Sequence, residues 1–185
     1  MPTDWTVRAI TRAMLPVLLV LTLVEIGSGL VLESFAGELY RSPSLLVLVP
    51  VTIGTAGNLG SVLAARLSTS FHLGRLSFSP TDDRLAGNAA ATVALALSVF
   101  PLVGGGAWLL ADLTAGARLP LEVVVFVAVA SGAVLSVLAV IVTVVATYGA
   151  YRFELDPDDV VIPVVTNVCD VLGVVVLFGV VVAVV

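Results

Sequence analysis

The chain has 185 residues, of which 59% are hydrophobic and 11% are charged, and its net charge is −5. An ordinary soluble domain is about 45–50% apolar and about 25% charged. This difference excludes a soluble enzyme, a nucleic-acid-binding protein and a disordered chain, because too few polar side chains are present to cover a water-exposed body of this size. The composition predicts an all-α membrane protein whose surroundings are the lipid bilayer.

Five apolar segments are long enough to cross a membrane, which requires about 20 mainly apolar residues in a helix. Short segments that contain Gly, Pro and Asp separate them, and these residues favour turns. We therefore predict a single five-helix transmembrane unit over residues 1–185, with no soluble regulatory domain. The predicted spans are 13–32, 45–67, 85–110, 121–147 and 160–185.

The arginines predict how the helices are oriented. Six of the eight fall on one side of the predicted membrane, namely Arg8, Arg12, Arg66, Arg75, Arg84 and Arg152. Only Arg41 and Arg118 fall on the other side. Because basic residues concentrate in cytoplasmic loops, we expect a cytoplasmic N-terminus, and the odd number of helices places the C-terminus outside. We expect a multi-pass protein of the plasma membrane.

Two acidic residues, Glu25 and Asp170, fall near the middle of a span, where a charged side chain costs about 2.5–3.5 kcal/mol. Asp170 shares one helix face with residues spaced three or four apart, namely Pro163, Thr166, Asn167 and Gly173. This face predicts a cation-binding stripe, since no basic residue lies near the middle of any span to neutralise the charge. The alternative is a carboxylate that is protonated, or bonded to a neighbouring helix, and serves packing.

Glu25 has two interpretations that the sequence leaves open. It binds a second ion or takes up a proton coupled to transport, or it is a protonated hydrogen-bond donor between helices. We treat it as a secondary candidate.

The second span carries small or polar residues on one side, namely Gly54, Gly57, Asn58, Ser61 and Ala65. Such a stripe usually means close helix packing, but it also lets backbone carbonyls face a cavity. The amide of Asn58 needs partners in the membrane and favours the second interpretation. Asn88, near the start of the third span, is a weaker candidate and is also explained as a helix cap.

Other polar residues receive plainer interpretations. His72 is predicted to be a solvated loop residue, and Cys169 a small buried one. The acidic fourth loop either concentrates cations at the mouth of a path or is a solvated charge cluster; its residues are Glu154, Asp156, Asp158 and Asp159.

The chain contains no nucleotide-binding loop, zinc-protease motif or nucleophile elbow, and no nucleophile and base form a pair. We therefore predict a transporter and not an enzyme.

Two segments carry a family resemblance. The segment Leu48–Gly74, LVPVTIGTAGNLGSVLAARLSTSFHLG, resembles the second-helix signature of the MgtE magnesium transporters and their relatives in solute carrier family 41. The segment Asp156–Gly173, DPDDVVIPVVTNVCDVLG, resembles the entry into that family's last helix, with the same spacing of Asp156, Pro157, Pro163 and Asp170. The AGN at Ala86–Asn88 resembles the Gly-Asn that opens its third helix.

The resemblance implies a divalent-cation transport domain that works as a dimer, with the ion path on the two-fold axis. Asp170 matches the family's ion-binding aspartate, and Thr166, one turn earlier, would lend an oxygen. Gly57 and Asn58 match the segment that lines the path, and Asn167 shares the face of Asp170. Mg²⁺ is then the transported ion, and no cofactor is implied.

The chain departs from the family in three ways. Val62 stands where bacterial members have a glutamine, and we expect no counterpart of the large cytoplasmic regulatory region of many bacterial members. The eukaryotic relatives fuse two five-helix units, so this single unit is expected to pair with itself or with a related half. Two other functions remain open, namely a proton- or sodium-coupled exporter of small molecules and a non-transporting partner subunit.

Overall fold

The computed structural model describes residues 6–79 and 82–185, apart from the side chain of Ala13, and these residues form helices and no strand. Residues 1–5 and 80–81 of the predicted unit lie outside the described residues. The helices are α1 Val7–Ser34, α2 Ala36–Arg41, α3 Pro43–His72, α4 Asp83–Ala115, α5 Leu121–Arg152 and α6 Pro157–Val184. All except α2 are long and apolar enough to cross a membrane, which confirms the prediction of five membrane-spanning helices.

Each of the five long helices is longer than the span predicted for it. The helix α3 runs through residues 43–72 where the prediction was 45–67, and α5 ends at Arg152 where the prediction was 147. Hydropathy marks only the part of a helix that lies in hydrocarbon, whereas backbone hydrogen bonding continues into the polar interface. The short helix α2 was not predicted; it ends in a pair between Glu38 and Arg41 whose N···O distance is 3.4 Å.

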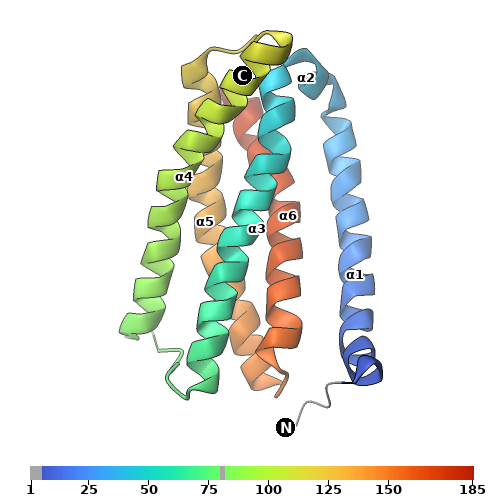
Figure 1. Cartoon of the computed structure of the whole chain (residues 1–185), viewed down its shortest axis with the longest axis vertical. Coiled ribbons are helices and arrows are strands. Elements are labelled where there is room, and N and C mark those ends of the chain that lie inside the picture. Colours follow the sequence, from blue (N-terminus) through green and yellow to red (C-terminus); the bar gives the residue numbers. More distant parts are fainter. Residues whose placement is uncertain (1–5, 80–81) are drawn as a thin grey trace.

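The long helices alternate in direction, so the chain begins at one end of the bundle and finishes at the other (Figure 1). The helix α3 lies centrally and packs against α4, α5 and α6, whereas α1 lies at the edge and contacts α6 and α2. The six arginines predicted on one side belong to the end where α1, α4 and α6 begin. The other two meet at the α2 end, where Arg118 Nη1 donates to the Arg41 carbonyl at 3.0 Å.

The interior changes in character along the bundle. Near α2 it consists of large side chains such as Leu48 and Leu177, and Phe35 stacks on Phe178 with ring centroids 4.1 Å apart. Toward the other end the buried cluster is built from smaller residues, namely Ala64, Ala139, Ala150, Val161, Val165 and Cys169. In lipid, helices associate through close packing and not by escaping water, so small residues let α3, α5 and α6 approach closely.

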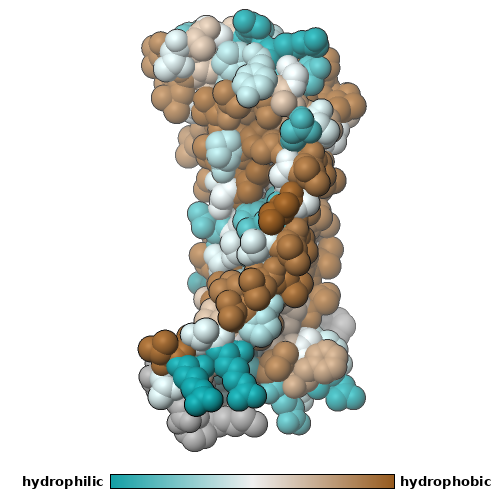
Figure 2. Space-filling model, turned by 90° about the vertical axis from the view of Figure 1, so that its right-hand side faces the viewer, coloured by the Kyte–Doolittle hydropathy of each residue, from teal (hydrophilic) through white to brown (hydrophobic). Residues whose placement is uncertain are grey.

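On the face seen in Figure 2, apolar side chains predominate between two polar ends, with a smaller polar patch at mid-height. Large side chains such as Leu23, Leu102 and Val145 are at least 64% exposed. A surface of this kind is suited to lipid and not to water.

Candidate ion-binding site

Asp170 and Gly57 meet at the centre of the bundle. Asp170 is the fourteenth of the 28 residues of α6, and Gly57 is the fifteenth of the 30 residues of α3. A Cβ atom placed on Gly57 would lie 3.1 Å from Asp170 Oδ1 and 3.5 Å from Thr166 Cγ2. The carboxylate therefore lies against the backbone of the facing helix, at a position where any side chain would press on it.

Two further glycines bring α3 and α6 together on either side of this contact. A Cβ on Gly60 would lie 2.7 Å from Val165 Cγ1 and 3.2 Å from Cys169 Sγ. A Cβ on Gly173 would lie 3.0 Å from Cγ1 of Ile53, one turn before Gly57. Cys169 is buried, as expected. The position of the Asp170 carboxylate is thus set by a glycine-lined contact that runs along both helices.

Each of the two helices contains a proline seven residues before its central residue, Pro50 before Gly57 and Pro163 before Asp170. A proline inside a helix lacks an N–H group and leaves the carbonyl four residues earlier without its helical partner. Carbonyl oxygens released in this way are acceptors that water or a cation can use within the membrane.

The polar neighbours of Asp170 on α6 bond to their own helix. Thr166 Oγ1 donates to the Ile162 carbonyl at 2.9 Å, and Asn167 Nδ2 donates to the Pro163 carbonyl at 3.0 Å. These bonds use the Thr166 hydroxyl hydrogen and one of the two Asn167 amide hydrogens, and both side-chain oxygens keep lone pairs. The predicted face of α6 therefore offers oxygen acceptors beside one carboxylate, which suits a hard cation.

Two other candidates, Glu25 and Asn58, are exposed on the surface of the single chain. Glu25 lies on α1, which packs against α6. Asn58 follows Gly57 on α3, but its side chain is exposed on the face that also carries Pro50 and Gly54. Among the described residues, its amide group has no hydrogen-bond partner.

Asn88 does not join this group. Its Oδ1 accepts a hydrogen bond from Arg66 Nε and its Nδ2 donates to the Arg84 carbonyl at 2.8 Å, so it links α3 to α4 at the arginine-rich end. The cap of α4 is Asp82 instead, which accepts from the backbone N–H groups of Arg84 and Leu85.

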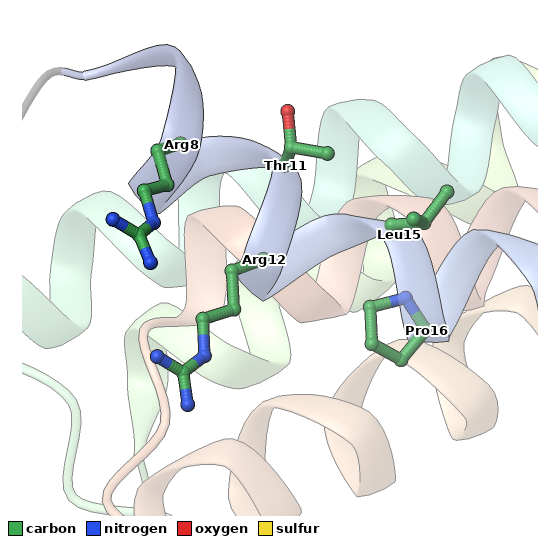
Figure 3. Close-up of a pocket in the computed structure, with 5 residues that line it drawn as sticks. All are labelled: Arg8, Thr11, Arg12, Leu15 and Pro16. Atoms are coloured by element: carbon green, nitrogen blue, oxygen red, sulfur yellow. The ribbon is translucent and has the colours of Figure 1, made fainter.

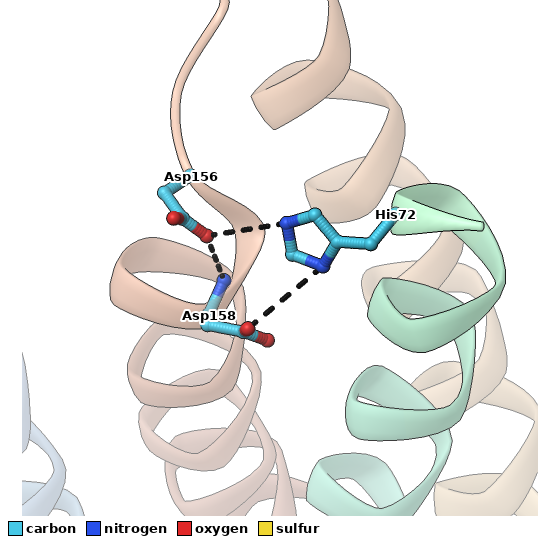
Figure 4. Close-up of side chains that lie close together, drawn as sticks. All are labelled: His72, Asp156 and Asp158. Atoms are coloured by element: carbon cyan, nitrogen blue, oxygen red, sulfur yellow. Dashed lines mark hydrogen bonds and ion pairs between the residues drawn. The ribbon is translucent and has the colours of Figure 1, made fainter. Parts of the chain in front are cut away.

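The structure also forms a cluster that the sequence analysis missed. His72, the last residue of α3, lies between the carboxylates of Asp156 and Asp158 at the start of α6 (Figure 4). Its Nε2 is 3.8 Å from Asp156 Oδ1, and its Nδ1 is 3.9 Å from Asp158 Oδ2. Because 84 residues separate His72 from Asp156, only the paired carboxylates were visible in the sequence, and they were interpreted without a partner.

Two surface hollows lie away from Asp170, at the arginine-rich end. One, of about 600 Å³, follows the first turns of α1 past Arg8, Thr11, Arg12, Leu15 and Pro16. The guanidinium groups of Arg8 and Arg12 point in the same direction there (Figure 3). The other, of about 350 Å³, is lined by residues of α3 and α4, including Arg66 and Asn88. Arginines at this level suit the phosphate groups of lipids and not a cation path.

Comparison with known proteins agrees with these features. The chain is 29% identical over 131 residues to solute carrier family 41 member 3 of Rattus norvegicus, in a match that covers 69% of this chain and 28% of that protein. The chain thus spans about a quarter of the length of this relative. Residues 49–180, which include Gly57 and Asp170, match the family model of MgtE, described as a divalent cation transporter. The chain belongs to the MgtE family of divalent cation transporters.

Proposed function

We propose that this chain moves Mg²⁺ across the plasma membrane, with Asp170 as the central ligand of the ion. The observation that carries this proposal is the position of Asp170 halfway along α6, against Gly57 halfway along α3. Mg²⁺ prefers oxygen ligands and gives up its water reluctantly. One carboxylate per chain, with the oxygens of Thr166 and Asn167 nearby, suits an ion that keeps much of its hydration shell.

We further propose that two copies, or this chain and a related half, form the path together. The support comes from Asn58 and Glu25, which are exposed on the surface of a single chain. An amide or carboxylate at membrane depth is costly when it faces lipid and usually faces a protein interior or a water-filled cavity. A partner chain that covers the exposed sides of α3 and α1 would give Asn58 and Glu25 polar surroundings. It would also bring a second Asp170 close to the first.

The orientation proposed from the arginines fits this path. With the N-terminus in the cytoplasm, the six arginines and the acidic start of α6 lie at the cytoplasmic mouth.

The second candidate function is a proton- or sodium-coupled exporter of small molecules. Its specific support is that Glu25 lies on α1, which packs against the helix that carries Asp170, since acids on neighbouring helices are suited to exchanging a proton for a cation.

The test is flux into liposomes that contain the purified chain alone. Mg²⁺, Mn²⁺, Co²⁺ and Ca²⁺ are compared, each with and without a sodium or proton gradient. We expect Mg²⁺ uptake by the unchanged chain and uptake at the level of empty liposomes for Asp170→Ala. The matched control is Asp112→Ala, which removes an exposed acid at the far end of α4 and should retain uptake.

Normal uptake by a folded Asp170→Ala variant would overturn the role of Asp170. Export of an organic cation without divalent flux would favour the second function. Crosslinking of the Asn58→Cys variant tests the paired arrangement. The new thiol would form a disulfide between two copies only if the faces of α3 that carry position 58 meet.

A further inference from the structure

We propose that His72, Asp156 and Asp158 form a second metal site, distinct from Asp170, which takes a divalent transition-metal cation such as Zn²⁺. One imidazole nitrogen of His72 and one oxygen from each carboxylate lie within 4.8 Å of one another. Donor atoms that share one ion at bond lengths of about 2.1 Å lie roughly 3–4 Å apart. The three side chains are partly exposed, so small rotations would bring their donor atoms onto one ion.

The surrounding residues hold both carboxylates in place. The buried hydroxyl of Ser68, one turn before His72, donates to Asp158 Oδ1 at 2.5 Å and leaves Oδ2 directed at the imidazole. Asp156 caps α6 by accepting from the Asp158 backbone N–H at 3.0 Å. Such hydrogen bonds to ligand carboxylates are the usual second shell of a metal site, and they reduce the cost of ordering the ligands.

The ring of His72 is also held. Phe71 packs edge-on against His72, with centroids 5.7 Å apart, and edge-on against Tyr151 of α5 at the same distance. Among the described residues, no arginine forms an ion pair with Asp156 or Asp158. The two carboxylates therefore bring negative charge to the imidazole ring, and a divalent cation would compensate it.

The donor set distinguishes this site from the one at Asp170. Imidazole nitrogen suits Zn²⁺ and its neighbours among the transition metals, whereas Mg²⁺ prefers oxygen and keeps its water. Three protein ligands with open positions for water match a partly exposed site. We therefore expect Zn²⁺ to bind here and Mg²⁺ not to displace it at equal concentration.

The location suggests what an ion would do. It would join the last residue of α3 to the first turn of α6, the two helices whose centres carry Gly57 and Asp170. An ion at this end would restrain the two helices from separating. This effect rests on the proposed function, but binding of the ion does not.

The test uses the full chain in lipid nanodiscs with Asp170→Asn as the background, so that the central site does not contribute. Because His72 is the only histidine, labelled imidazole gives one set of NMR signals that reports on this site alone. We expect Zn²⁺ to shift these signals and to bind once per chain by calorimetry. We expect His72→Gln and Asp158→Asn to weaken binding at least about tenfold.

Asp156→Asn is the second ligand variant, because asparagine preserves the helix cap while it removes the charge. Asp83→Asn, an exposed acid at the same end of the bundle, is the matched control and should leave binding unchanged. Imidazole signals that do not respond to Zn²⁺ would overturn the site. If both Asp156→Asn and Asp158→Asn bound Zn²⁺ as tightly as the background chain, this result would also overturn the site, because the histidine would then bind without the carboxylates.

Discussion

The helices α1 and α6 have the same length, 28 residues, and each contains one interior proline and one acid near the middle of its predicted span, yet they are placed very differently. Of the most apolar stretch of α1, 6% is buried, compared with 33% for α6. Near Asp170, side chains of α6 pack against Gly57 and Gly60 of α3. By contrast, a Cβ on Gly27 or Gly29 of α1 would meet nothing within 4 Å. Apolarity thus brings a helix into the membrane, while complementary small residues decide where its acid lies.

The largest expected effect concerns stability and tests the packing of α6. A Cβ on Gly60 would press on Val165, whose branched side chain has little freedom to move. We expect Gly60→Ala to lower the free energy of unfolding by about 1–3 kcal/mol. Gly27→Ala on α1 should be neutral or slightly stabilising, because alanine favours helix. Thermal or denaturant unfolding in detergent compares the two; a strong loss for Gly27→Ala would show that another chain covers α1.

The next effect concerns the site and not the fold. We expect Gly57→Ala to reduce divalent-cation flux roughly tenfold, because the added methyl group would displace the Asp170 carboxylate. Gly105→Ala on α4 is the control, since a Cβ there also meets nothing within 4 Å and Gly105 lies on neither α3 nor α6. Liposome flux and unfolding are measured on the same samples. Equal flux in both variants would mean that the contact between α3 and Asp170 has no part in transport.

A smaller effect is expected from the acid of α1. Glu25→Gln removes a charge but preserves the shape of the side chain, so divalent flux down its own gradient should persist. If Glu25 couples transport to sodium or protons, the stimulation by either gradient should disappear in this variant. Flux measured with and without each gradient decides the matter, and an unchanged gradient dependence would remove Glu25 from the mechanism.

The smallest effect lies at a helix end outside both α1 and α6, and it tests whether caps contribute as much as packing. The backbone N–H of Ser77, assisted by its hydroxyl and by the backbone of Leu85 and Arg84, lowers the pKa of Asp82 from 3.8 to about 2. Folding thus favours the charged Asp82 carboxylate. Its contribution to stability is complete above the ordinary pKa of 3.8 and is lost as the pH falls toward 2. Asp82→Ala should therefore unfold at a lower temperature than the unchanged chain near about pH 5, with the difference disappearing near pH 2. A pH-independent difference would contradict this account.

Much of the fold was predictable because it depends on local properties. The five spans follow from runs of apolar residues, and the face of α6 with Pro163, Thr166 and Asp170 follows from helical spacing alone. The short helix α2 and the extended helix ends escaped prediction, because hydropathy does not register helix that lies in the interface. Asn88 was assigned to the group of candidate ligands, but its pairing with Arg66 depends on how α3 and α4 lie together.

The amino-acid sequence by itself determined that the chain lies in a membrane, how many times it crosses, and which acids enter the hydrocarbon, since these follow from composition and length. Only the tertiary structure decided that Gly57 faces Asp170 and that α1 lies at the edge. It also brought His72 between two aspartates 84 and 86 residues away. The physical reason is that lipid favours all apolar helices alike. The order and rotation of the helices therefore depend on where a small residue of one helix leaves space for a side chain of its neighbour. Such a match is a property of two helices together.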